Sequence, residues 1–262
     1  MVSGIGAFTI SCLKETAQVL KLLREILYWI FIAPFKGKPL KIKLIFDQMI
    51  FSGWHSTLIV FFVTMFTGIV LAMQAAYQLE KMGALMYVAS LVAVSLCREL
   101  SPVLTALVVG GRVGSAIAAE LGTMKVSEQI EALETMAINP VKFLAVPRFI
   151  ALFFMLPVLT IFGDAAGIFG GYLMGVHSLK INPALYTQIT FKFLLLKDIY
   201  TGLAKSFVFA MIIALIGCRQ GLNTRGGAEG VGKATTNSVV LSFIFIILAD
   251  CIITGIFYFS NM

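Results

Sequence analysis

Long hydrophobic runs alternate with short polar segments along this chain. Five of the runs reach the roughly 20 residues that an α-helix needs to cross the hydrocarbon of a bilayer. They lack the alternation of apolar and polar residues that a membrane β-strand shows. The pattern therefore predicts an all-α integral membrane protein with five transmembrane helices, at about residues 51–76, 84–110, 149–176, 199–218 and 238–259.

An amphipathic segment precedes the first run. Over residues 5–33, apolar side chains recur at helical spacing on one face, and lysine, glutamine and glutamate occupy the other. This pattern predicts a helix that lies in the membrane interface, with Tyr28 and Trp29 at the level of the lipid headgroups. A basic linker completes the segment 5–47 and suits a cytoplasmic surface that faces anionic lipid. Its lysines are Lys36, Lys38, Lys41 and Lys43.

A polar segment, residues 111–147, lies between the second and third predicted spans. Apolar residues recur at helical spacing with carboxylates between them, which predicts a short amphipathic helix over 126–136. Ser127 is expected to cap its start, and Asn139-Pro140 to end it, because proline cannot donate the next backbone hydrogen bond. Such a helix between two spans is suited to contact a soluble partner; an ordinary cytoplasmic loop is the alternative.

Composition and charge support this assignment and add an orientation. Hydrophobic residues make up 59% of the 262 and charged residues 13%, whereas soluble domains average about 45–50% and about 25%. With five spans, 14 lysines and arginines fall on the side of the N-terminus and the polar segment, and four fall on the other side. Because basic residues concentrate in cytoplasmic loops, we expect the N-terminus and residues 111–147 in the cytoplasm and the C-terminus outside. The whole chain, 1–262, is expected to form one domain, with its membrane part at 51–259.

The sequence offers no catalytic or metal-binding constellation. Its four cysteines are far apart, so neither a metal site nor a disulfide framework is expected. Residues 227–234 read GAEGVGKA, close to the phosphate-binding pattern GxxxxGK[ST], but Ala234 stands where a hydroxyl should reach magnesium, and no strand precedes the segment. We expect a glycine-rich loop at 219–233, another loop at 177–198, no enzymatic activity and no cofactor in this chain. Uphill transport would draw its energy from a partner or an ion gradient.

Of the ionisable side chains inside or at the edge of the predicted spans, we take four as candidates for a substrate path: Arg98, Glu99, Lys205 and Asp250. Charge in hydrocarbon is costly, so these groups should face protein or a water-filled cavity. Arg98 and Glu99 could instead form a structural pair that fixes helix packing. Lys205 lies near the start of its span, from which its ammonium group could extend to the interface. In the third span, glycines recur at every fourth position from Gly163 to Gly175, which favours close helix packing.

The polar segment also carries a family resemblance. Residues 111–148, GRVGSAIAAELGTMKVSEQIEALETMAINPVKFLAVPR, resemble the signature of the MlaE permease family of lipid-transporting ABC systems. The upstream RELSPVLTALVVGGR and the downstream GVGKATTNSVV also resemble family segments, and the likeness extends over nearly the whole chain. Ser101 stands where the family pattern has glycine, and Lys125 where arginine is common.

The resemblance implies a homodimeric permease in the inner membrane of a Gram-negative-type cell, with a cytoplasmic ATPase that binds ATP and magnesium. It implies an MCE-domain phospholipid carrier on the periplasmic side, a STAS-domain protein as a further partner, and a role in outer-membrane lipid asymmetry. Related permeases serve chloroplast envelopes and mycobacterial lipid import. The polar segment would be the coupling region, with ATPase contacts at Glu120, Lys125, Glu128, Glu131, Leu133 and Glu134. Arg98 and Lys205 would suit a lipid phosphate. Glu99 and Asp250 would suit a headgroup amine or would hold the two cations in place.

Two other functions are compatible with the residues. An ion-coupled secondary carrier would use Glu99, Asp164 and Asp250 as proton or sodium sites, and an inverted repeat would favour it; no repeat is visible. A membrane scaffold without transport would also present a polar segment to a partner.

Overall fold

The computed structural model describes residues 18–33 and 41–259, and these are almost entirely helical, with no strand among them. The first part of the predicted interfacial helix, residues 5–17, lies outside the described residues, as do Lys36 and Lys38. Five helical stretches are long and apolar enough to cross a membrane: Ile42–Glu80, Leu85–Val126, Val141–His177, Leu196–Leu222 and Gly227–Phe259. The prediction of an all-α membrane protein with five spans is therefore confirmed.

Each of the first three stretches is a chain of consecutive helical segments that include π-helical turns. The first consists of α2 (Ile42–Met49), η3 (Ile50–Trp54) and α3 (His55–Glu80). The second consists of η4 (Leu85–Tyr87), α4 (Val88–Ser95), η5 (Leu96–Leu100), α5 (Ser101–Val109), η6 (Gly110–Gly114) and α6 (Ser115–Val126). The third consists of η7 (Val141–Ala145) and α8 (Val146–His177). The remaining helices are α7 (Gln129–Thr135), α9 (Pro183–Phe193), α10 (Leu196–Leu222) and α11 (Gly227–Phe259).

Two predicted loops are wrong because helices continue past the hydrophobic runs. Residues 111–126 extend the second span as η6 and α6, since alanine, leucine, methionine and glutamate favour helix even where the side chains are polar. In the segment 219–233, α10 continues to Leu222 and α11 begins at Gly227, so that only a short turn separates them. Gly226 and Gly227 make this turn at φ +90° and +70°, values that glycine adopts without steric cost.

The short amphipathic helix predicted at 126–136 exists, but its boundaries differ from the prediction. Helix α7 begins at Gln129, after Glu128 turns the chain at φ 59°. Ser127 does not cap it, because its hydroxyl donates back to the carbonyl of Thr123. Asn139 does not end it either: the Asn139 side chain accepts a hydrogen bond from the Lys142 N–H at 3.0 Å and so caps the following helix.

The predicted loop 177–198 contains the amphipathic helix α9. Asn182 caps its start by accepting hydrogen bonds from the Ala184 and Leu185 N–H groups, and Pro183 occupies the first turn, where no N–H is needed. Tyr186 anchors α9 against the bundle, with its ring edge-on to Tyr172 at 5.6 Å. This loop prediction is therefore wrong, because a good cap and one buried face suffice for a short helix.

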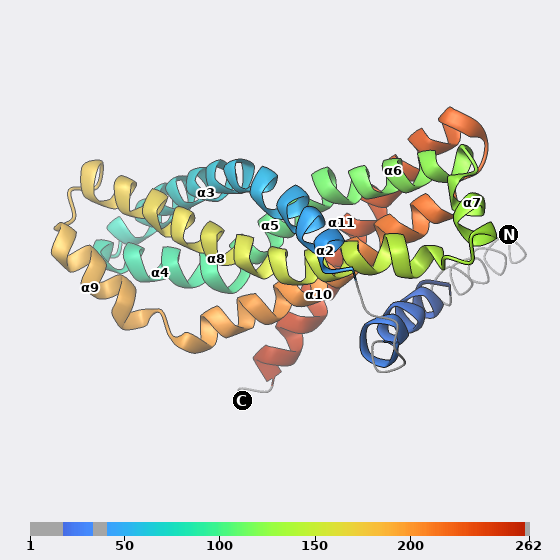
Figure 1. The fold of residues 1–262 in the computed structure, drawn as a ribbon. Helices are drawn as coiled ribbons and strands as arrows, with labels where there is room; N and C mark the ends of the chain where they lie inside the picture. The colour runs from blue at the N-terminus through green and yellow to red at the C-terminus, as the bar shows by residue number, and fades with distance from the viewer. Residues whose placement is uncertain (1–17, 34–40, 260–262) are drawn as a thin grey trace, which may run out of the picture.

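Helix α8 runs along the length of the bundle and packs closely on α3 (Figure 1). The glycine spacing predicted this contact. A Cβ atom on Gly170 would lie 2.2 Å from the Met65 carbonyl oxygen, and one on Gly68 would lie 2.0 Å from the Gly167 carbonyl oxygen. Only a hydrogen at these positions lets the two backbones approach so closely, so the small residues hold α3 and α8 together.

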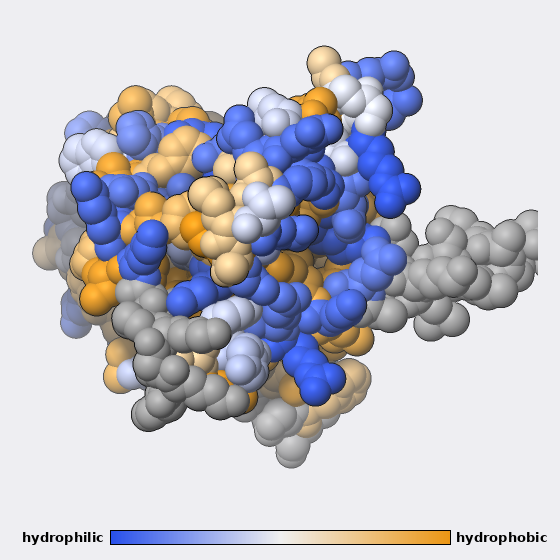
Figure 2. Space-filling view, turned by 45° about the vertical axis from the view of Figure 1, so that its right-hand side comes forward, coloured by the Kyte–Doolittle hydropathy of each residue, from blue (hydrophilic) through white to orange (hydrophobic). Residues whose placement is uncertain are grey.

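The N-terminal helix, residues 18–32, lies at the same end of the molecule as α7, whereas α9 lies at the opposite end (Figure 1). Leu22 and Ile26 pack into the core beside α8 and α10, and Leu20 and Phe31 are exposed. Figure 2 brings the α7 end forward and shows hydrophilic residues gathered over it. The flanks of the bundle carry exposed apolar side chains, as expected of surfaces that contact lipid.

Candidate functional site

The four predicted intramembrane charges lie in one network that three helices build. Arg98 and Glu99 are carried by the π-helical turn η5, Lys205 by α10 and Asp250 by α11. A π-turn inserts an extra residue and redirects the side chains that follow, which is why such turns often occur at functional sites. Here it places two consecutive charged side chains against α10 and α11.

Lys205 is the centre of the network. Its side chain is fully buried, and its Nζ atom contacts Glu99 Oε2, Asp250 Oδ1 at 2.8 Å and Thr254 Oγ1 at 2.7 Å. Thr254 in turn donates to Glu99 at 3.2 Å. The expectation that Lys205 extends to the interface is wrong, because two carboxylates and a hydroxyl inside the bundle compensate the desolvation of its ammonium group.

Arg98 forms the open side of the network. Its Nε lies 3.9 Å from Glu99 Oε1 and its Nη1 lies 3.9 Å from Asp198 Oδ1, and about a third of its side chain is exposed. These are ion-pair distances, longer than hydrogen bonds, so the guanidinium makes no hydrogen bond with the part of the chain that the structure describes. Its donors are therefore available to an incoming oxyanion.

Sequence reasoning missed two members of this network. Asp198 was placed in a loop, but it lies in the first turn of α10, where its carboxylate also accepts the Leu195 N–H at 3.2 Å. Thr254 carries no charge, yet it lies one turn beyond Asp250 on the same face of α11. With two cations and three carboxylates, the network has a formal charge of −1.

A second candidate region is the corner formed by α6 and α7. Glu120 on α6 forms a 2.8 Å ion pair with Arg148 of α8, and the Arg148 guanidinium also donates to the Leu144 carbonyl oxygen at 2.7 Å. Arg148 is only 4% exposed, so Glu120 joins α6 to α8 rather than projecting freely. Arg148 is thus a buried residue that fixes α6 against α8.

Of the other residues predicted to contact an ATPase, some are paired or packed within the chain and others are exposed. Lys125 pairs with Glu131 across the turn between α6 and α7, and this hydrogen bond from the ammonium group is the main cause that lowers the pKa of Glu131. Leu133 packs inward against the core. Glu128 and Glu134 are exposed and form no ion pair with any described residue. The corner therefore presents two exposed carboxylates, Glu128 directly before α7 and Glu134 on it, that pair with no described residue.

The phosphate-loop-like segment has a helical geometry. Residues from Gly227 onward form the first turns of α11, and Lys233 pairs with Glu229 one turn away at 2.8 Å. A helix directs its side chains outward and cannot wrap its backbone N–H groups around a phosphate as a phosphate loop does. Within the described ranges, no group of three or more metal-ligating side chains occurs.

The fold and the two regions define a multi-pass membrane protein with a helical corner at one end and a charge network toward the other. Ionisable side chains inside a helical membrane bundle commonly mark the path of a substrate or an ion. The class is thus a membrane permease.

Comparison with known proteins identifies the family. The family model described as Permease MlaE matches residues 45–256, which include both regions. A probable ABC transporter permease protein of Rickettsia typhi is 44% identical over 84% of this chain and 85% of its own length. One of Synechocystis is 41% identical over 81% of each chain. The chloroplastic protein TRIGALACTOSYLDIACYLGLYCEROL 1 of Arabidopsis thaliana is 38% identical over 74% of this chain and 55% of its own. The chain belongs to the MlaE permease family, as the resemblance predicted.

Proposed function

We propose that this chain is the lipid-conducting subunit of an ABC transporter that moves phospholipid between the inner membrane and a periplasmic MCE-domain carrier, and so maintains outer-membrane lipid asymmetry. In this proposal ATP and magnesium bind to a separate cytoplasmic ATPase, a STAS-domain protein assists the ATPase, and this chain has no catalytic step. Two observations of kinship support it: the family match, and the glycerolipid that appears in the name of the Arabidopsis relative.

The observation that carries the lipid assignment is Arg98. A guanidinium group binds a phosphate in a planar, two-pronged geometry, and here its donors are not used by other described residues. Glu99 and Asp198 hold it at 3.9 Å, close enough to orient it and too far to occupy it. A phosphodiester entering between the helices can accept these hydrogen bonds, while Glu99 and Asp250 stay compensated by Lys205.

Transfer of a labelled phospholipid between proteoliposomes and the MCE-domain carrier tests this role. The Arg98→Gln variant should reduce ATP-dependent transfer by about tenfold or more, because a hydrogen bond to a charged group contributes about 1.5–3 kcal/mol. Arg98→Lys keeps the charge and controls for loss of the fold, and should recover part of the rate. Lys81→Gln, at an exposed site outside the network, should have no effect. Unchanged transfer by Arg98→Gln would refute the proposed phosphate contact.

The ATPase is expected to dock on the corner of α6 and α7. Glu128 and Glu134 are the exposed carboxylates there, and they can pair with basic groups of a partner, mainly fixing its orientation. We expect the double variant Glu128→Lys/Glu134→Lys to lose the ATPase in a detergent pull-down and to keep the MCE protein. Glu80→Lys, at the opposite end of the bundle, is the matched control. Retention of the ATPase by the double variant would exclude this docking surface.

The proposal includes a homodimer in which α11 contacts its partner copy. In the most apolar stretch of α11 only 11% of the residues are buried, the lowest share among the five spans. A second copy against this helix would cover its exposed apolar side chains and enclose the Asp250 side of the network. Cross-linking of Ile247→Cys in membranes should give a dimer, whereas Phe169→Cys on α8 should not. The N-terminus and α7 would be cytoplasmic and the C-terminus periplasmic.

The ion-coupled carrier is the competing hypothesis, and the structure separates its candidate sites. Glu99 and Asp250 both contact Lys205, whereas Asp164 is buried on α8 beside Cys97 and Ser101. Transport that continues with an ATPase unable to hydrolyse ATP, and stops when the proton and sodium gradients are abolished, would favour the carrier.

A further inference from the structure

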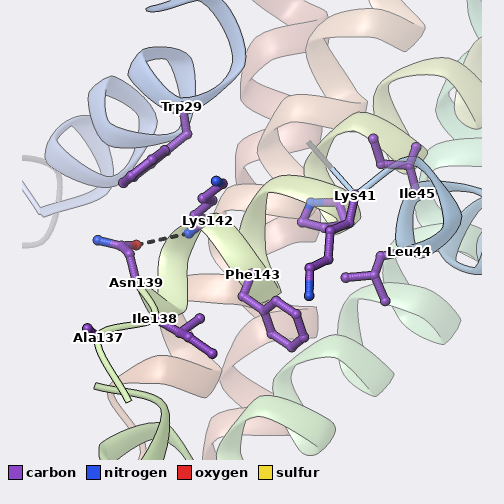
Figure 3. A pocket seen from close by; sticks show the side chains of 10 residues that line it. Trp29, Lys41, Leu44, Ile45, Ala137, Ile138, Asn139, Lys142 and Phe143 are labelled. Carbon is purple, nitrogen blue, oxygen red and sulfur yellow. Dashed lines mark hydrogen bonds between the residues drawn. The ribbon is translucent and has the colours of Figure 1, made fainter. Parts of the chain in front are cut away.

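A cavity of about 490 Å³ lies at the α7 end of the molecule, apart from both regions described above (Figure 3). Its walls come from three parts of the chain: the end of the N-terminal helix, the start of α2, and the segment that joins α7 to α8. Because these segments are far apart in the sequence, the cavity exists only when the N-terminal helix is docked on the bundle.

The polar groups of this cavity are cationic. The Lys41 ammonium lies 4.8 Å from the centre of the Phe143 ring, and the Lys142 ammonium lies 5.2 Å from that of Trp29. In the described parts of the chain no carboxylate lies within ion-pair distance of either lysine. In Figure 3 the two side chains come from different segments, and Lys142 extends toward Trp29 while Lys41 extends toward Phe143. Two aromatic rings thus lie beside two ammonium groups that form no ion pair with a carboxylate of residues 18–33 or 41–259.

The hydrogen-bonding groups of Asn139 are largely committed. Its side-chain oxygen accepts the Lys142 N–H at 3.0 Å, and its amide nitrogen donates to Glu25 of the N-terminal helix at 3.4 Å. Asn139 therefore fixes the position of Lys142 relative to the N-terminal helix. The remaining wall is apolar, with Leu44, Ile45 and Pro147 among its residues.

The surroundings of the cavity indicate a membrane ligand. Next to it, the N-terminal helix exposes Phe31 and Ile32 at 64% and 47%, and α2 exposes Ile42 and Phe46 at 65% and 59%. In a membrane protein such surfaces face lipid, and Trp29 belongs at headgroup depth. The cavity thus combines apolar walls with positive charge at the level where lipid phosphates lie.

We propose that this cavity binds the phosphate-bearing headgroup of an anionic membrane phospholipid. Lys41 and Lys142 supply the charge, each through a flexible four-carbon stem that can turn toward the phosphate, and the apolar wall accommodates the glycerol end. The ligand would tie the N-terminal helix and α2 to the segment that follows the coupling helix. The proposal rests on the cavity and the membrane fold, not on phospholipid transport, so either can fail without the other.

Trp29 provides a built-in probe, because the chain has only two tryptophans and the other, Trp54, is exposed. The experiment uses the full-length Trp54→Phe variant in phosphatidylcholine nanodiscs. A minor fraction of the lipid carries bromine on its acyl chains close to the headgroup. This brominated lipid is phosphatidylglycerol in one sample and phosphatidylcholine in the other. Quenching of Trp29 should be stronger with brominated phosphatidylglycerol, and this preference should fall about fivefold for each lysine changed to glutamine at 41 or 142.

Three controls decide between outcomes. Lys43→Gln removes a neighbouring exposed lysine outside the cavity and should change the preference by less than either Lys41→Gln or Lys142→Gln; equal effects would mean general surface attraction and would overturn the site. Lys41→Arg/Lys142→Arg should keep the preference, and thereby exclude misfolding as the cause of its loss. Inorganic phosphate in the buffer should leave the quenching unchanged; its reversal would indicate a site for soluble phosphate and would overturn the lipid assignment.

Discussion

Replacing Lys205 by methionine tests the charge network most directly. The ammonium is fully buried and contacts Glu99, Asp250 and Thr254, so the Lys205→Met substitution removes the cation that both carboxylates share. Breaking a buried ion pair by removing one partner costs about 3–5 kcal/mol, because the charge that stays behind is uncompensated.

Partial exposure of the two carboxylates to solvent decides where in this range of about 3–5 kcal/mol the loss of stability should fall. The Glu99 and Asp250 side chains are 33% and 24% exposed, so water screens part of their charge after the substitution. We therefore expect the lower limit, about 3 kcal/mol. For a chain of this size that corresponds to a decrease in Tm of roughly 6–12 °C. Thermal unfolding of the purified protein in detergent measures it.

A triple variant separates charge from packing. Glu99→Gln/Lys205→Met/Asp250→Asn leaves no unpaired charge, and replacing a whole buried ion network is often neutral or stabilising. It should therefore recover most of the lost Tm while remaining inactive in lipid transfer. Lys81→Met, at an exposed site, should change the stability by less than about 0.5 kcal/mol. If Lys205→Met is no less stable than Lys81→Met, the reasoning about the network is refuted.

Three further predictions concern packing and titration. Gly170→Leu should destabilise the α3–α8 contact by at least about 1–3 kcal/mol, since its side chain must displace the Met65 backbone; Gly255→Ala, with open space around it, should be neutral or slightly stabilising in the same unfolding assay. Burial raises the pKa of Tyr186 to about 12, so the stability that this phenol contributes should be lost as the pH rises from about 10 to 12. In an absorbance titration, Tyr186→Phe should remove an ionisation step near pH 12. Lys125 lowers the pKa of Glu131, so the stability that their pair contributes is present above the ordinary carboxyl pKa and is lost as the pH falls through the lowered value. Hydrogen exchange of the α7 amides measures this acid dependence, and Glu131→Gln should abolish it. An unchanged pH profile in the variant would contradict the prediction.

The membrane spans could be predicted from the sequence, because a bilayer demands long apolar segments and nothing else in the chain resembles them. Their ends could not, since helix formation does not stop where hydrophobicity does. Residues 111–126 are polar but rich in helix-forming residues, and they continue the second span as η6 and α6. Helix α9 is short and mixed in character, so only Asn182-Pro183 at its start could have indicated it.

The sequence predicted most of the charged residues that belong to the candidate site, but not which of them form ion pairs. Charges in apolar runs need partners, which identified Arg98, Glu99, Lys205 and Asp250 individually. Which group meets which depends on the π-turn at Leu96–Leu100, and single-sequence periodicity does not show where an extra residue is inserted.

The second span joins the two regions in one uninterrupted piece of backbone. Arg98 lies toward one end of it, and Lys125 lies at the other, about 40 Å along the helix axis. Two π-helical turns, Leu96–Leu100 and Gly110–Gly114, lie along this stretch, and a helix can bend at such turns. If the corner of α6 and α7 moves, the geometry of these two turns decides how much of that displacement reaches Arg98.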